Sequence, residues 1–476
     1  MANFKKEYKQ AWTSYTEEDL KILFDYADRY KSFISENKTE RECVRTLVKQ
    51  AEEAGYRNLE ELIKTDTKLS AGDKVYANYL DKALILCCIG EKSLEEGLRL
   101  LGAHIDSPRL DLKPNPLYED TDIALFKTHY YGGIKKYQWV ALPLAIHGVV
   151  AKKDGSMVNI VIGEDESDPV VGISDLLIHL AGEQMQKKLS EAITGEDLNV
   201  CLGTIPLQDK EKDKDKEKEK EKDMVKANIL NLLNEKYGIE EEDFVSAEIE
   251  IVPAGRARDY GLDRSMVIGY GQDDRVCSYA SFEAQLEVVR PLKTTMTVLV
   301  DKEEIGSVGA SGMHSKFFEN TVAEILNLVG EYSSLKLRRT LAGSKMLSSD
   351  VTAAYDPNHP SVLEKYNAAY LGKGVVFNKY TGSKGKSGSN EANAEYVAEL
   401  RKMVEDNHII WQTSELGRID LGGGGTIAYI VANYGMDVID CGVGVHSMHA
   451  PWEVTSKADL YEMRKTYVAF LKNEFR

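Results

Sequence analysis

The second half of the chain alternates short apolar runs with amphipathic segments, and this alternation constrains the fold more than any other feature. Residues 294–300 form an apolar run of strand length, and residues 317–330 follow with the spacing of a helix. Residues 438–446 repeat the strand pattern, and residues 455–475 close the chain with a helical one. Alternating strands and helices predict a mixed or parallel sheet that is covered by helices on both faces. We therefore expect an α/β fold in which helices sandwich a mixed sheet.

Between residues 111 and 255 the chain is rich in β-branched and aromatic residues instead. An Asp-Gly pair supplies a hairpin turn between two such runs, and residues 173–189 are expected to form a helix. We predict that residues 111–255 are a β-rich domain, inserted into a larger domain that residues 1–110 and 256–476 form together.

The formal net charge of the chain is −17, which disfavours contact with nucleic acid or with an anionic membrane. Acidic and basic residues alternate over residues 209–223, a pattern typical of a solvated loop, with a charged docking arm as the alternative. The most apolar stretch, residues 140–151, is too short to span a bilayer. The six cysteines show no metal-site spacing, and the first residues lack the apolar core of a secretory signal. We therefore expect a cytoplasmic protein that does not bind membranes.

Acidic and histidine side chains stand where several of the apolar runs end. Singly, each has a structural explanation, such as a helix cap, a hydrogen-bonded histidine or a solvated pair of glutamates. Their recurrence at five run ends favours a common site, because reacting groups of such sheets collect at the strand ends. The residues are His104 and Asp106, Asp273 and Asp274, Glu303 and Glu304, Asp350, and His446 and His449.

Carboxylates and two histidines without a thiolate suit zinc, manganese or cobalt as the bound metal. Two divalent ions bring four positive charges, while two Asp, one Glu and two neutral His bring three negative ones, so a bridging hydroxide would neutralise the site. A metal ion can then neutralise one of the adjacent glutamates, and the other is left to take a proton from the metal-held water. Asp106 lies on the same strand face as His104 and is placed to orient its imidazole.

An ordered set of motifs resembles the aspartyl aminopeptidase and vacuolar aminopeptidase I family of dinuclear zinc exopeptidases. The resemblance covers nearly the whole chain, and it implies a metallopeptidase catalytic domain with an inserted dimerisation domain. The motifs are HIDSPRLDLKP, YYGG, DDRVCSY, DKEEIGSVGASG, SSDVTAAYDPNHP, RIDLGGGGTI and SMHAPWE.

The resemblance implies a set of metal ligands, each at a position that matches a family motif. His104 and Asp350 would hold one ion, and Glu304 and His449 would hold the other. Asp273 would bridge the two ions, which are expected to be zinc, with cobalt or manganese as alternatives.

The resemblance also implies the catalytic roles. Glu303 would be the general base, and Asp106 would support His104. His179, in the inserted domain, would reach into the site of a neighbouring subunit, bind the substrate there and stabilise the developing oxyanion. Family members assemble through this domain into dimers and then into tetrahedral dodecamers.

The implied function is a cytosolic metalloaminopeptidase that removes N-terminal residues from peptides, using a bridging water and Glu303. Family members that prefer acidic N-terminal residues carry a lysine near residues 374–388, where Val376 or Phe377 stands in this chain. Nearby lysines leave the register open, so an acidic preference and a neutral or apolar one are both retained.

Two alternatives to an aminopeptidase are also retained. A deacylase of N-acyl amino acids would use the same dinuclear site, and a catalytically inactive assembly protein would keep only the fold. His446 is interpreted as a loop histidine rather than as a third histidine ligand, because unliganded histidines are the more frequent case.

Overall fold

The computed structural model describes residues 8–208 and 223–473 of the chain, and these residues form two compact units. Of the described residues, the larger unit comprises residues 8–107, 257–448 and 452–473. The smaller unit comprises Pro108–Arg256 together with His449–Pro451. The charged tract predicted at residues 209–223 lies, apart from its last residue, outside the described residues.

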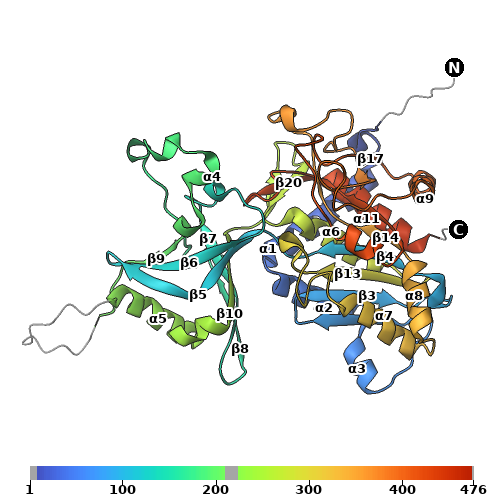
Figure 1. Cartoon of the computed structure of the whole chain (residues 1–476), viewed down its shortest axis with the longest axis horizontal. Coiled ribbons are helices and arrows are strands. Elements are labelled where there is room, and N and C mark those ends of the chain that lie inside the picture. The colour runs from blue at the N-terminus through green and yellow to red at the C-terminus, as the bar shows by residue number, and fades with distance from the viewer. Residues whose placement is uncertain (1–7, 209–222, 474–476) are drawn as a thin grey trace, which may run out of the picture. The chain divides into compact units, whose positions relative to one another are not determined.

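A nine-stranded sheet runs through the larger unit (Figure 1). Strand β4 lies between β13 and β14 and is parallel to both, whereas β13 pairs antiparallel with β3. The sheet is therefore mixed, and the predicted α/β fold is confirmed. In spatial order the strands are β1 (Arg57–Asn58), β2 (Lys74–Tyr79), β3 (Ala83–Cys88), β13 (Thr295–Val300), β4 (Arg99–His104), β14 (Lys345–Ser348), β18 (Asp437–Gly442), β16 (Val375–Asn378) and β17 (Trp411–Thr413).

Helices cover both faces of this sheet, because its strands carry apolar side chains on both faces. In β3, Leu84 and Leu86 belong to one buried apolar cluster, while Ile85 and Cys87 belong to another. The first cluster includes residues of α1 (Glu17–Glu36), α2 (Glu40–Glu53), α6 (Gln272–Leu286), α9 (Ala394–Asp406) and α11 (Lys457–Lys472). The second includes residues of α3 (Leu59–Lys64), α7 (Phe317–Leu328), α8 (Ser334–Ala342) and α10 (Ala428–Ala432).

The first two helices begin at capping boxes. Thr16 accepts a hydrogen bond from the backbone N–H of Asp19, whose carboxylate accepts one from the N–H of Thr16. Thr39 and Glu42 make the same reciprocal pair at the start of α2. Each box satisfies backbone donors that the first turn of a helix leaves without partners.

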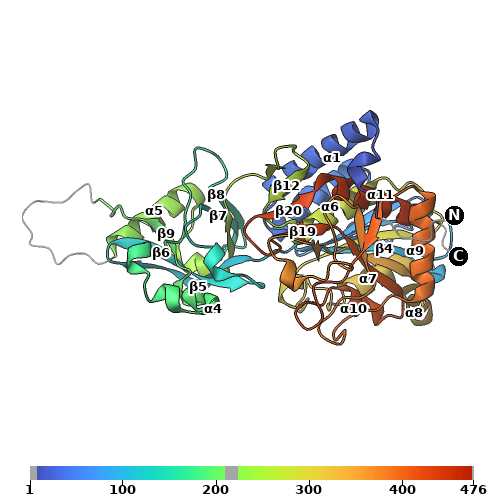
Figure 2. The same cartoon turned by 90° about the horizontal axis from the view of Figure 1, so that it is seen from above.

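A second, five-stranded sheet of the larger unit packs near α6, as Figure 2 shows. It positions the start of α6, because β12 leads directly into that helix and pairs with β20. Its strands, in spatial order, are β11 (Arg258–Tyr260), β12 (Met266–Gly269), β20 (Glu453–Ser456), β19 (Gly444–His446) and β15 (Thr352–Ala353).

The smaller unit is built on a six-stranded antiparallel sheet with helix α5 (Met224–Tyr237) beside it. Gly155 turns the β7–β8 hairpin with a φ of +85°, a conformation that glycine adopts without strain. The strands, in spatial order, are β8 (Met157–Ile162), β7 (Leu144–Ala151), β10 (Ala247–Pro253), β5 (Arg109–Asp120), β6 (Ile123–Tyr131) and β9 (Val200–Gly203).

The prediction of a helix over residues 173–189 is wrong. The segment holds only the short turns η4 (Ile178–Leu180) and η5 (Gln184–Gln186), before the four-residue helix α4 (Leu189–Ala192). Most of its leucine, isoleucine and methionine side chains are more than half exposed. An amphipathic helix gains most of its stability from packing its apolar face, and the described residues of the chain do not cover these side chains.

Among the described residues, every helix falls short of the combined length and apolarity that crossing a membrane requires.

Candidate metal centre

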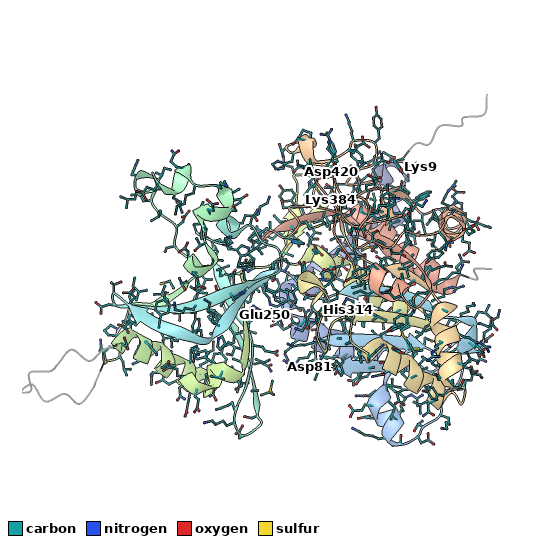
Figure 3. The ribbon with its side chains drawn as sticks, viewed as in Figure 1. Lys9, Asp81, Glu250, His314, Lys384 and Asp420 are labelled. Atoms are coloured by element: carbon teal, nitrogen blue, oxygen red, sulfur yellow. The ribbon has the colours of Figure 1, made fainter. Side chains whose placement is uncertain are left out.

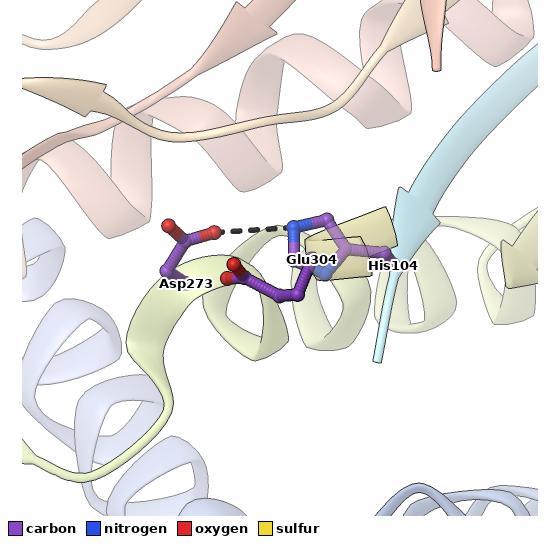
Figure 4. A group of neighbouring side chains, drawn as sticks. All are labelled: His104, Asp273 and Glu304. Atoms are coloured by element: carbon purple, nitrogen blue, oxygen red, sulfur yellow. Dashed lines mark hydrogen bonds and ion pairs between the residues drawn. The ribbon is translucent and has the colours of Figure 1, made fainter. Parts of the chain in front are cut away.

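Four segments of the larger unit bring acidic and histidine side chains to one edge of the nine-stranded sheet. His104 is the last residue of β4, and the 3₁₀ turn η8 (Glu303–Ile305) follows the parallel neighbour β13. Asp350 follows the other parallel neighbour, β14. Asp273 comes from the first turn of α6, whose backbone at this residue is not helical. Because parallel strands end at the same edge of a sheet, these side chains meet there, as Figure 4 shows for His104, Asp273 and Glu304.

The imidazole of His104 is buried between two aspartates. Its Nδ1 lies 3.0 Å from the backbone oxygen of Asp106 and 3.3 Å from Oδ1 of the same residue, so Nδ1 donates to Asp106. On its other side, Nε2 lies 3.1 Å from Oδ1 of Asp273. If the ring is neutral and its proton is on Nδ1, then Nε2 is an acceptor, and it faces the carboxylate oxygen of Asp273, which is also an acceptor. Either a cation lies between them or the ring takes a second proton.

The carboxylate of Asp106 also fixes the turn that carries the adjacent glutamates. Its Oδ1 accepts a hydrogen bond from the backbone N–H of Glu303 at 3.1 Å, and its Oδ2 accepts one from the N–H of Glu304 at 3.2 Å. Asp106 is fully buried. The two glutamate backbones are thereby held beside His104, and Oε2 of Glu303 lies 3.9 Å from Nε2 of His104.

Asp273 is held by Glu453 and Ser107, and Gln272 holds Glu453 in turn; the sequence interpretation missed all three roles. The buried Glu453 accepts a hydrogen bond from the backbone N–H of Asp273 at 3.1 Å. Gln272 donates its side-chain amide to the backbone oxygens of Glu453 at 2.6 Å and Val267 at 3.0 Å. The hydroxyl of Ser107 donates to the backbone oxygen of Asp273 at 2.6 Å. Glu453 is the last residue of the SMHAPWE motif, and its place in that motif was the one sequence signal that could have indicated its role.

Two groups of side chains in this cluster have the composition of a metal site. One comprises His104, Asp273 and Glu304, and the other comprises His104, Asp274 and Asp350. Within each group, one ligand atom per residue lies within 4.8 Å of the others. Nitrogen and carboxylate ligands in this number suit a divalent transition metal such as zinc.

The electrostatics of the cluster also fit a cation. Burial lowers the pKa of His104, but hydrogen bonds to Asp106 and Asp273 outweigh burial and hold that pKa well above its usual value. Burial raises the pKa of Asp350 well above its usual range, and the charge of Asp274 raises it further. Buried acids so close together repel one another unless positive charge is supplied. The residues present therefore fit a bound metal.

The structure places the remaining candidates outside these two groups. His449 belongs to the smaller unit, where its Nδ1 lies 2.8 Å from the backbone oxygen of Gly133. His179 is exposed on η4 of the same unit. His446 directs Nε2 at the backbone oxygen of Tyr355 at 3.0 Å, as a loop histidine would.

A cavity of about 360 Å³ lies between two loops of the larger unit. Lys384 and Lys386 come from one loop, and Glu415 and Arg418 come from the other. Lys384 and Asp420 mark the two loops in Figure 3. Val376 and Phe377 are buried in β16.

Comparison with known proteins gives consistent matches over almost the entire chain. A family model described as aminopeptidase I zinc metalloprotease (M18) matches residues 33–471. A relative from Clostridium acetobutylicum, described as a probable M18 family aminopeptidase 1, is 64% identical over 98% of this chain and 99% of its own length. A relative of the same description from Thermotoga maritima is 45% identical over 98% of both chains.

Solved structures show the same likeness. The crystal structure of aminopeptidase I from Clostridium acetobutylicum matches 99% of this chain and all of its own, with a TM-score of 0.90 and 61% identity. That of the M18 family aminopeptidase from Thermotoga maritima matches 98% of this chain and all of its own, with a TM-score of 0.91 and 44% identity. A dodecamer of mApe1 from S. cerevisiae has a TM-score of 0.73 and 21% identity, covering 94% of this chain and 96% of its own, and it shows a shared fold.

Proposed function

The chain belongs to the M18 family of zinc aminopeptidases, and we propose that it cleaves single residues from peptide N-termini at a two-metal centre. The observation that carries this proposal is the convergence of His104, Asp273, Glu304 and Asp350, from four separate segments, at one edge of the sheet. Family membership favours this function over the deacylase and the inactive assembly protein.

The proposed ligands of the two ions are His104, Asp273, Glu304, Asp350 and His449, with Asp273 shared between the ions. Asp273 lies 3.1 Å from Nε2 of His104 and also falls in one ligand group with Glu304, which supports a role toward the ions that each of these residues would hold. When bound, the ions would polarise the scissile carbonyl and make a water molecule more acidic.

Glu303 is the proposed general base. It accepts a proton from the attacking water and later delivers that proton to the leaving amine. Its backbone is held by Asp106 while its side chain is not part of either ligand group, which suits a carboxylate that must exchange protons. Asp106 holds the tautomer of His104 that leaves Nε2 directed at Asp273.

The smaller unit is proposed to pair two copies of the chain. Exposed apolar side chains are concentrated between residues 176 and 189, where His179 also lies. A surface of this kind marks an interface more often than a free face. We propose that His179 stabilises the oxyanion in the neighbouring subunit's site and that dimers assemble into a dodecamer, as the dodecamer of the yeast relative supports.

The proposed compartment is the cytoplasm. All six cysteines are free thiols, and Cys201 is the exposed one. Free thiols suit a reducing compartment.

The experiment that tests the function compares the wild type with Glu303→Gln. We expect the variant to fold, to bind the same amount of metal and to lose kcat by a factor of about 10²–10⁴, because it lacks the proton acceptor. The matched control is Glu319→Gln, at a glutamate of α7 that pairs with Lys316. Undiminished turnover in Glu303→Gln would remove Glu303 from the mechanism.

Substrate preference is tested with acidic, basic and apolar aminoacyl substrates, each assayed with zinc, cobalt and manganese. We propose a neutral or apolar preference, because Val376 or Phe377 stands where acid-preferring members of the resembling family carry a lysine. Faster release of acidic residues would contradict this preference. It would indicate that basic side chains elsewhere bind the acidic N-terminal residue, such as Lys384, Lys386 or Arg418 at the loop cavity. A free-amine peptide should be cleaved and its N-acetylated form should not, since a deacylase would show the reverse.

A further inference from the structure

Asp274 is a buried carboxylate to which the proposed ligand set gives no role. It is fully buried, and by distance and angle neither of its oxygens forms a hydrogen bond with the described residues, although the thiol of Cys277 and the backbone of His104 stabilise its charged form. A buried carboxylate in that state costs several kcal/mol unless a cation or a donor compensates it. Its burial therefore requires an explanation.

The neighbouring groups offset that cost only in part, because burial outweighs the stabilisation that the thiol of Cys277 and the backbone of His104 give to the charged form. Cys277, one turn further along α6, directs its thiol at the sulfur of Met463 at 3.6 Å. The adjacent Arg275 donates to the backbone oxygens of Ile105 at 3.2 Å and Lys38 at 2.7 Å. The side chains that do lie beside Asp274 are His104 and Asp350, each with a ligand atom within 4.8 Å.

We propose that Asp274 is a further carboxylate ligand of the metal centre, and that it binds the ion held by His104 and Asp350. This inference rests on the two-metal centre proposed above. It adds a sixth protein ligand to the five that the sequence suggested, and it assigns that ligand to one of the two ions.

The charge of the centre supports this assignment. Asp273, Asp274, Asp350 and Glu304 carry four negative charges when ionised, and two divalent ions carry four positive ones. The protein ligands alone then balance the ions, so the attacking water can be neutral until Glu303 accepts its proton. Without Asp274 the protein ligands supply only three negative charges. The ion held by His104 and Asp350 is then the one that lacks a carboxylate ligand.

The test is metal binding by the full-length protein after its metals have been removed with a chelator. Zinc and cobalt are titrated separately into the wild type, Asp274→Asn and Asp274→Ser, and calorimetry follows the binding. The cobalt absorption spectrum adds a reading of the coordination of each ion. We expect two ions in the wild type, and in each variant one ion of unchanged affinity and one whose affinity falls by at least about tenfold.

The matched control is Asp440→Asn, which removes a buried carboxylate of β18 that is in neither ligand group. This variant should bind two ions as the wild type does. Thermal melting of the metal-free proteins shows which variants fold. If Asp274→Asn does not fold, the smaller side chain of Asp274→Ser provides the comparison.

Two ions of wild-type affinity and an unchanged cobalt spectrum in a folded Asp274 variant would overturn the inference. Equal weakening of both ions would overturn the assignment to one of them. A wild type that binds no metal would instead refute the metal centre itself, so the two failures are distinguishable.

Discussion

Asp440 shows how a single buried acid in this sheet makes stability depend on pH. Burial raises its pKa from 3.8 to about 6, although the hydroxyl of Thr426, at 2.6 Å, opposes that rise. Between these two values the unfolded chain has released the proton and the folded chain still holds it. Asp440 therefore lowers the free energy of unfolding as pH rises from about 4 to about 6, and its effect levels off above that range.

The variant Asp440→Asn should remove this contribution. We expect its melting temperature to fall less than that of the wild type between pH 4 and pH 6, and to run parallel to it above pH 7. Melting curves at several pH values measure the difference. A difference between the two proteins that does not change with pH would show that Asp440 ionises at an ordinary pKa.

Individual site residues were predictable where a strand end marks them. His104, Glu304 and Asp350 follow apolar runs, and the structure brings their side chains into the two ligand groups. Asp274 and Glu453 were not assigned, because an acid beside a helix start or a strand end is usually a cap or a solvated side chain. Only their burial, which a sequence does not show, sets them apart.

At the scale of elements, the turn η8 depends on one side chain from another strand end. Asp106 accepts hydrogen bonds from the backbone N–H groups of Glu303 and Glu304. It therefore positions the proposed general base and one proposed metal ligand. The sequence pattern predicted an orienting role for Asp106 toward His104. The hydrogen bonds to η8 were not predictable, because residues 106 and 303 are distant in the chain.

Asp106→Asn should disturb η8 without unfolding the protein. The amide keeps one acceptor but turns a donor toward the second backbone N–H, so we expect kcat to fall by about 10–100-fold with a smaller change in KM. Steady-state kinetics and metal content together check this. Asp459→Asn is the comparison, because the buried carboxylate of Asp459 also accepts two backbone N–H groups, those of Gly372 and Gly374, which do not belong to η8. Equal kinetics for Asp106→Asn and the wild type would contradict the role.

At the scale of the whole molecule, the structure of residues 173–189 could not be predicted from the sequence of a single chain. The apolar spacing there predicted a helix, but the structure shows short turns with exposed leucines. A pattern that serves contact with a second copy resembles one that serves an internal core. The mixed sheet, by contrast, was predictable, since its strands are buried within one unit.

The double variant Leu177→Ser, Leu180→Ser should weaken self-association, because it removes two exposed apolar side chains beside His179. We expect a smaller species by light scattering, and lower activity per chain if His179 acts in a neighbouring site. His179→Gln is the paired variant, and it should keep the assembly while losing activity. An unchanged particle mass for the double variant would place the interface elsewhere.

The central claim is that two metal ions are held by side chains from four segments at one edge of the sheet together with His449. The most direct measurement is a crystal structure of the zinc-loaded protein with anomalous diffraction at the zinc edge. Two neighbouring zinc peaks, both contacted by Asp273, with Glu304 and His449 on one and His104 and Asp350 on the other, are the predicted result. Zinc peaks away from these residues, or none in a protein that still cleaves peptides, would contradict the account.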